Sequence, residues 1–341
     1  RPALTMRGVA LAAAMLLMWR PEAITEPGFQ MSFAAVAALV AVAEWGAAHP
    51  KGRYGVFWRY LRGIAVTALV GSLATLPFAL FHFGRTTHYA VLGNLIAMPV
   101  MGFWVMPAAA LSVILMPLGW DGPVLALLGE GIAVMLALGG WVAHLPGAVS
   151  LAPAMPLSAL LAISGGGLWL VIWRGARRWP GLLGLAGGVV LAMAAPRPDM
   201  LVAPDGRTVA IRGGDGLLHF AQPPKDRFDA REWLRRDGDA RMLEEAAGMT
   251  SLRCDGVGCV VRGGRGGVIA LSRRPEALGD DCAMARILVT ALPVNCRGPA
   301  LVIDGPAAQA GEGWAISFTP LSVTSVRQDR GRRPWVPRSQ Q

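Results

Sequence analysis

The stretch PGFQMSF, residues 27–33, stands directly before an apolar run from Ala34 to Trp45. Its first two residues, a proline and a glycine, interrupt the preceding chain, so we expect a new helix to begin here. A bilayer offers no hydrogen-bond partners to the backbone, and a helix is an element that satisfies its own backbone groups. The stretch therefore predicts a membrane-spanning helix with two polar side chains, Gln30 and Ser32, near its N-terminal end.

The polar side chains of Gln30 and Ser32 have two interpretations. A polar group in an otherwise apolar segment is costly unless it bonds a neighbour or meets water. In the first interpretation, the two side chains cap the helix or bond a neighbouring helix. In the second, they lie on the wall of a polar path across the membrane. The residues alone leave both interpretations open.

Three stretches resemble one known family. The segment RPEAITEPGFQMSFAAVAALVA is similar to the core signature of the ComEC family of competence proteins, inner-membrane channels for DNA uptake. Two further matches, NLIAMPVMGFWVMP and LPGA (residues 145–148), follow in the family's order. The motif residues that are candidates for lining the channel or for a structural role are Gly28, Phe29, Gln30, Ser32, Phe33, Asn94, Pro99 and Pro107.

The resemblance implies a membrane channel component that takes up single-stranded DNA during natural transformation. It also implies DNA, membrane lipids and other competence proteins as partners, and a homo-oligomer is left open. We find no phosphate-cradling loop in the sequence, so an ATP-driven motor would be a separate protein. The chain begins at Arg1 rather than at a methionine, and we expect it to be the C-terminal fragment of a longer protein.

The composition divides the chain in two. Hydrophobic residues make up 54% and charged residues 16% of the 341 residues, which is too apolar for an ordinary soluble protein. The acidic residues before Pro196 are only Glu22, Glu26, Glu44, Asp121 and Glu130. After this point charged residues are frequent. We therefore predict a polytopic α-helical membrane domain over residues 1–196 and a soluble, extracytoplasmic α+β domain with a basic C-terminal tail over residues 197–341.

The apolar half predicts several helices. The expected crossing segments after the first are Gly63–Phe83, Tyr89–Leu118, Pro123–Leu145, Pro153–Trp173 and Gly181–Ala195. The segment Lys51–Arg62, which mixes aromatic residues with cations, predicts a separate interfacial helix. We expect His82, near the end of its segment, to be an interfacial anchor, with a polar lining as the alternative.

The segment Tyr89–Leu118 is too long for a simple span, and prolines interrupt it. Broken backbone in a membrane is tolerated where it is buried in protein or lines a water-filled cavity, so we expect one interrupted helix or two half-helices. Asn94 is expected to be a buried polar group, bonded to a helix or to substrate. Glu130, between two glycines, is a further channel candidate that we expect to be protonated, paired or close to the surface.

The net charge of +10 suggests nucleic acid at first, but the positions of the cations favour topology. Two short loops, residues 51–62 and 174–178, hold most of the basic residues of the membrane half, which is the positive-inside pattern. If the first loop lies in the cytoplasm, one crossing for each of the four predicted helices between the loops puts the second loop in the cytoplasm as well. The count places everything after Pro196 outside the cytoplasm, in the periplasm.

The second half predicts short strands around Asp-Gly turns, one helix over Phe228–Arg236, and buried strands over Arg286–Thr290 and Pro299–Asp304. This pattern indicates an α+β domain or a layered α/β sandwich. Its four cysteines favour disulfides outside the cytoplasm, and proximity favours pairing them as Cys254–Cys259 and Cys282–Cys296. A four-thiolate zinc site is the rival, although the usual close spacing is missing.

Many ComEC relatives end in a metallo-β-lactamase-like domain, whose chemistry needs a cluster of His and Asp ligands. This half of the chain has one histidine, His219. We therefore expect a degenerate relative of that domain or a different domain, with no metal, no cofactor and no catalysis. The leading function is a DNA-uptake channel, and the alternative is a transporter of another solute with an extracytoplasmic accessory domain.

Overall fold

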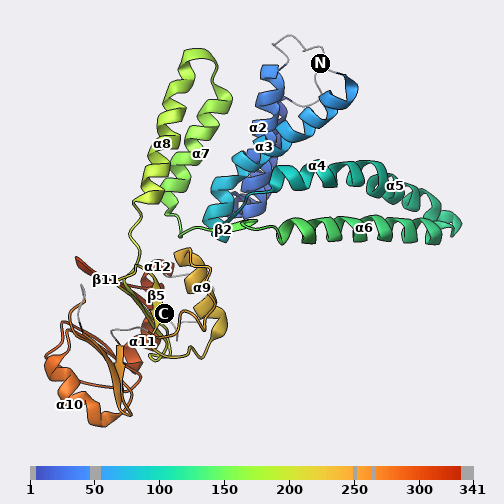
Figure 1. Ribbon diagram of the computed structural model, residues 1–341. Coiled ribbons are helices and arrows are strands. Elements are labelled where there is room, and N and C mark those ends of the chain that lie inside the picture. The colour runs from blue at the N-terminus through green and yellow to red at the C-terminus, as the bar shows by residue number, and fades with distance from the viewer. Residues whose placement is uncertain (1–4, 47–54, 249–251, 263–265, 332–341) are drawn as a thin grey trace. The chain divides into compact units, whose positions relative to one another are not determined.

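The computed structural model describes residues 5–46, 55–248, 252–262 and 266–331. The chain divides into two compact units, Arg1–Ala195 and Pro196–Gln341. The first is built from apolar helices and the second from mixed helices and strands (Figure 1). The predicted fold class, a polytopic helical domain followed by a soluble α+β domain, is confirmed.

The first unit contains eight α-helices in its described residues. They are α1 (Met6–Trp19), α2 (Pro27–Gly46), α3 (Val56–Phe83), α4 (Ala90–Val100), α5 (Met106–Leu115), α6 (Asp121–Ala143), α7 (Leu157–Ile172) and α8 (Trp179–Met193). Short helical turns are η1 (Pro21–Thr25), η2 (Met101–Val105), η3 (Met116–Leu118) and η4 (Gly175–Arg178). Four of the described helical runs are long and apolar enough to cross a membrane: Pro27–Trp45, Val56–Phe83, Ala90–Leu118 and Asp121–Ala143.

The helix α3 differs from the sequence prediction at its start. It begins at Val56 and continues without a break to Phe83, so the prediction of a separate interfacial helix is wrong for the described part of Lys51–Arg62. Residues 51–54 lie outside the described residues. A helix of 28 residues is about 42 Å long, which exceeds a hydrocarbon core of about 30 Å. Its first turns can therefore keep Trp58 and Arg59 at the interface without forming a helix of their own.

The helices α4, α5 and α6 form a hairpin that leaves the end of α3 and returns to it (Figure 1). The strands β1 (Arg85–Thr87) and β2 (Val149–Leu151) pair antiparallel and close the base of this hairpin. The turn at the LPGA motif supports the same closure, because the Tyr89 hydroxyl donates to the carbonyl oxygen of Pro146 at 2.9 Å. The hairpin thus begins and ends on one side of the helical unit.

The helices α7 and α8 pack against each other through glycines. A Cβ added at Gly166 would lie 2.6 Å from the carbonyl oxygen of Gly181, and one at Gly188 would lie 2.5 Å from the Ile163 side chain. Small residues let two helix backbones approach closely, which is how apolar helices gain contact in a bilayer. The glycines of the last apolar segment therefore form a helix–helix contact.

The second unit has two five-stranded sheets that pack face to face. One sheet has the order β10-β9-β8-β7-β6, with β8–β9 and β9–β10 parallel, and the other has the order β12-β11-β3-β4-β5. The strands of the first sheet are β6 (Leu252–Cys254), β7 (Gly258–Val261), β8 (Ile269–Ser272), β9 (Ile287–Thr290) and β10 (Leu301–Ile303). Those of the second are β3 (Met200–Val202), β4 (Val209–Arg212), β5 (Leu218–Phe220), β11 (Trp314–Phe318) and β12 (Leu321–Ser325).

Helices cover the outer faces of both sheets. The helix α9 (Arg227–Asp237) packs Ala230 and Leu234 against Leu218 and Phe220 of the second sheet. The helix α10 (Pro275–Met284) joins two parallel strands of the first sheet, β8 and β9, and adjoins a small cluster around Leu288. Two further helices are α11 (Gly305–Gly311) and α12 (Val326–Arg330). The result is the layered sandwich that the apolar runs indicate.

Candidate functional site

The residue Gln30 lies at the junction of three elements in the first unit. Its Nε2 donates to the carbonyl oxygen of Ile24 in η1 at 2.8 Å, and its Oε1 lies 2.7 Å from Nε2 of His82 near the end of α3. An amide oxygen only accepts, so the His82 ring donates through Nε2. Gln30 therefore bonds a neighbouring helix, as one of the two interpretations expects, and both side chains are half-buried.

The other residues of the first motif face different surroundings. The rings of Phe29 and Phe33 lie one turn apart with centroids 4.4 Å from each other. Ser32 and Gly28 are exposed on the unit, and a Cβ added at Gly28 would meet nothing within 4 Å. The motif thus sends Gln30 toward α3 and leaves Ser32 on an open face of α2.

The second motif forms the interrupted helix of the hairpin. Pro99 lies inside α4 and Pro107 in the first turn of α5, and the π-helical turn η2 separates the two helices. A proline removes a backbone donor and crowds the preceding turn, which explains the interruption. Of the two expected forms, the structure has one helical run with a break.

Asn94 is exposed on α4, so the prediction of a buried amide is wrong. The residue follows Gly93, where an added Cβ would lie 3.9 Å from the Val142 side chain of α6, and the next residue along a helix turns away from such a contact. Among the described residues the Asn94 side chain makes no hydrogen bond. An unpartnered amide on an apolar helix needs water or another molecule.

Glu130 lies on α6 beside the close contact between α6 and the π-helical turn. A Cβ added at Gly131 would lie 3.0 Å from Cδ1 of Trp104, and the Trp104 indole donates to the carbonyl oxygen of Leu127 at 2.9 Å. A side chain at Gly131 would therefore press on the Trp104 indole, which would have to shift by a few tenths of an ångström. The Glu130 side chain is exposed, and within the described residues no cation lies within ion-pair distance of it.

The C-terminal end of α2 and the basic segment that follows α7 lie together. Nη2 of Arg174 lies 2.7 Å from Oε2 of Glu44 near the end of α2, and the guanidinium of Arg178 lies over the Trp45 ring at 3.9 Å. The loop after α7 and the end of α2 are therefore on one side of the unit. This is the arrangement that the count of crossings requires.

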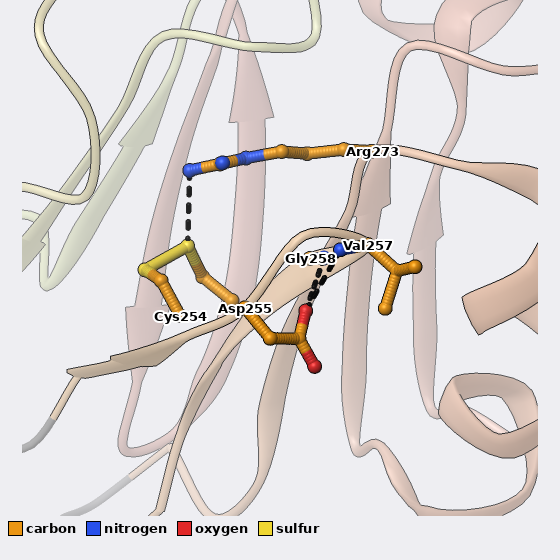
Figure 2. The surroundings of a disulfide bond; sticks show 6 residues. Cys254, Asp255, Val257, Gly258 and Arg273 are labelled. Atoms are coloured by element: carbon orange, nitrogen blue, oxygen red, sulfur yellow. Dashed lines mark hydrogen bonds between the residues drawn. A yellow bond between two sulfur atoms is a disulfide. The ribbon is translucent and has the colours of Figure 1, made fainter.

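The cysteines lie in the second unit, where Cys254 is joined to Cys259 and Cys282 to Cys296. These are the pairs that sequence proximity favours. Figure 2 shows the first disulfide at the β6–β7 turn, where Asp255 accepts the backbone N–H groups of Val257 and Gly258. These backbone N–H groups hold the pKa of Asp255 below its ordinary value.

Sequence reasoning missed His82 as the partner of Gln30 and placed it among the interfacial anchors. The signal was present, because a polar side chain in an apolar helix predicts a partner on a neighbouring helix. The two residues are 52 positions apart, and only the packing of α2 on α3 brings them together. Among the described residues, no hydrogen bond or ion pair joins Gln30, Asn94 and Glu130, which lie on α2, α4 and α6.

Comparisons with known proteins agree with the motifs. The chain is similar to ComE operon protein 3 of Bacillus subtilis (strain 168), with 26% identity over 113 residues, which are 32% of this chain and 13% of that protein. The match thus spans only a small part of that relative's length. No solved structure matches the chain. The family model described as Competence protein matches residues 1–177, more than half of the chain. The chain therefore belongs to the competence protein family.

Proposed function

We propose that the first unit forms part of a channel that passes single-stranded DNA across the inner membrane into the cytoplasm. Membership of the competence family supports DNA as the cargo. The four apolar helical runs that are long enough to cross a membrane support a transport role for the unit.

One observation carries the channel part of this proposal. Asn94 presents an unpartnered amide on an apolar helix, directly before a stretch broken by two prolines and a π-helical turn. A polar group of this kind is costly against lipid tails and is accommodated beside water. The exposed carboxylate of Glu130 on the returning helix adds a second polar group at a different position along the hairpin. We infer that both border a wet passage.

We further propose that the second unit lies outside the cytoplasm. The contact between Arg174 and Glu44 puts the two basic loops at one end of the unit, which supports a cytoplasmic position for that end. The helix α8 then carries the chain back across. A reporter that is active only in the cytoplasm, fused after Gln341, should therefore be silent, and an active fusion would reverse this orientation.

In this proposal the second unit binds rather than cleaves. Its one histidine, His219, is already engaged, with Nε2 at 2.8 Å from Oδ2 of Asp215 and Nδ1 at 3.0 Å from the carbonyl oxygen of Gly248. Metal-dependent DNA cleavage by the purified full chain, lost on His219→Ala, would contradict this part.

A cysteine-accessibility scan tests the wet passage. Asn94→Cys and Glu130→Cys should react with membrane-impermeant thiol reagents, while Leu136→Cys, a 72% exposed position on α6, should stay unreactive as a lipid-facing control. The native cysteines are paired and provide an unreactive background. If Asn94→Cys and Glu130→Cys are sealed from both sides, the helix breaks are only packing joints and the channel assignment fails.

An uptake assay tests the cargo. Transformation frequency should fall in Asn94→Leu and Gln30→Leu at unchanged expression, while Met98→Leu, one turn from Asn94 on α4, should leave it unchanged. A transporter of another solute predicts normal DNA uptake in all three variants.

A further inference from the structure

The second unit has a cavity of about 380 Å³ where its two sheets meet. Residues of β4 and the turn before it line one side, and the ends of β8 and β9 line the other. The strands β8 and β9 are parallel, so their carboxyl ends lie at this edge. Ligands of α/β sheets bind outside the carboxyl ends of such strands, and the volume is in the range of about 300–1,000 Å³ typical of small-molecule sites.

Three arginines line this cavity, Arg207 from the loop between β3 and β4, and Arg273 and Arg274 from the two residues between β8 and α10. All three are exposed to the cavity or to solvent. Within the described part of the chain, none of their guanidinium groups has a carboxylate oxygen within 4.0 Å. Their positive charge is therefore available to a ligand.

Neutral groups hold Arg273 in place. Its Nη2 donates to Sγ of Cys259 at 3.3 Å, and Figure 2 shows the side chain extended over the disulfide. On its other side, the amide oxygen of Gln222, in the orientation that satisfies both groups, accepts from Nε at 2.9 Å and from Nη2 at 3.2 Å. The guanidinium is thus held without a direct ion pair, as a preorganised anion site requires, although its charge also acts on the nearby carboxyl of Asp255.

Of the carboxylates near the cavity in sequence, Asp205, Asp255 and Asp281 are hydrogen-bonded, whereas Glu276, two residues after Arg274, is exposed in the first turn of α10. Asp205 accepts the backbone N–H groups of Arg207 and Thr208 and the Thr208 hydroxyl. Asp255 accepts the two N–H groups of the β6–β7 turn, and Asp281 is bonded to the hydroxyl of Ser272. Asp205 and Asp255 shape the turns beside the cavity, and Asp281 holds α10 to the end of β8.

A helix adds to the positive potential. The helix α10 has 10 residues and begins at Pro275, directly after Arg274, and no side chain caps its first turn. The N-terminus of a helix carries a partial positive charge and free N–H groups that favour phosphate. This helix begins beside the cavity rather than in its lining, and the Glu276 carboxylate in its first turn offsets part of the dipole, so the three guanidinium groups carry the positive charge of the cavity.

We propose that this cavity binds a phosphate ester of a nucleotide or of a DNA strand through Arg207, Arg273 and Arg274. Guanidinium groups match the geometry of phosphate oxygens and remain charged at all physiological pH values. Assigning the phosphate to a DNA strand rests on the function proposed above, whereas the anion site does not depend on it.

Binding to the full chain in nanodiscs tests the site, with three probes: inorganic phosphate, thymidine monophosphate and a fluorescent twelve-nucleotide oligothymidylate. The variant Arg207→Gln/Arg273→Gln/Arg274→Gln should bind the strand or the nucleotide at least about tenfold more weakly. The control Arg231→Gln/Arg253→Gln/Arg297→Gln removes the same charge from exposed positions outside the cavity and should stay within about twofold. For the strand, the slope of log K against log salt should fall by about 2 in the cavity variant, since each phosphate contact contributes about 0.7.

The outcomes separate the two proposals. Equal losses in the cavity and control variants, or no binding of any probe by the wild-type chain, overturn the site, while the uptake assay still decides the channel. Binding of the mononucleotide without the strand supports the site and removes its assignment to DNA. Strand binding that depends on the three arginines supports both parts.

Discussion

The side chains of Gln30 and His82 meet with Oε1 and Nε2 2.7 Å apart, and this contact joins the first turns of α2 to the end of α3. A second bond from Gln30 to the carbonyl oxygen of Ile24 fixes the chain before α2. A single amide therefore holds three elements at one end of the helical unit. Its two bonds use both its donor and its acceptor.

Replacing His82 should separate packing from hydrogen bonding. His82→Leu removes the donor, and we expect the unfolding free energy in mixed micelles to fall by about 0.6–1.7 kcal/mol, the range of helix–helix hydrogen bonds in membranes. His82→Gln can still donate and should recover most of the loss. Ser32→Ala, on the open face of α2, is the control that should leave stability unchanged. Equal stability of all three variants would show that the contact contributes nothing.

The α7–α8 contact should not tolerate a methyl group. Gly166→Ala puts a Cβ 2.6 Å from the carbonyl oxygen of Gly181, so we expect a loss of about 1–3 kcal/mol from overpacking. Gly165→Ala meets nothing within 4 Å and should stabilise the helix slightly, because alanine has the higher helix propensity. Thermal unfolding of the two variants in the same detergent compares them. A loss in Gly165→Ala as large as in Gly166→Ala would point to a general need for glycine in α7.

The buried ion pair of Arg212 and Asp237 should be sensitive to loss of one partner. Nη2 and Nη1 of Arg212 bond Oδ1 and Oδ2 of Asp237 at 2.6 and 2.9 Å, and the side chains are 13% and 5% exposed. Asp237→Ala leaves a buried cation and should cost about 3–5 kcal/mol. Hydrogen exchange of β4 measures this loss. The double variant Arg212→Met/Asp237→Leu should recover part of it, and no recovery would mean that the pair itself is net stabilising.

The pH dependence of the second unit should include a contribution from Asp239. Burial acts to raise the pKa of this carboxyl, but the hydrogen bonds and charge of Arg241 outweigh it, so the pKa lies below its ordinary value. A lowered folded pKa stabilises the fold above the unfolded pKa of about 3.9, and this contribution is lost as the pH falls through the folded value.

Asp239→Asn should therefore destabilise the unit at about pH 6 and have a smaller effect at about pH 2, because the wild type has by then lost the same contribution. Hydrogen exchange of β5, whose Leu218 carbonyl oxygen accepts from Arg241, follows this change at both pH values. Asp280→Asn, at an exposed position of α10, is the control. A destabilisation by Asp239→Asn that is the same at both pH values would exclude a role for its ionisation.

Local rules of the sequence predicted most elements of the second unit. Alternating apolar residues between Asp-Gly turns predicted β3, β4 and β5, and the run Phe228–Arg236 predicted α9 within one residue at each end. Elements without a distinct pattern were missed, such as α10, whose sequence PEALGDDCAM has no strong apolar face. Such a helix forms because it covers a sheet and connects two parallel strands.

The sequence by itself determined the membrane character of the first half, the division of the chain and the start of α2 at Pro27, because these depend on local composition and backbone chemistry. Only the tertiary structure decided that Gln30 bonds His82, that Asn94 is exposed, and that Arg207 lines one cavity with the distant pair Arg273 and Arg274. Those relationships depend on which faces of distant elements meet. The residues next to a side chain in the sequence do not specify which distant element it will contact.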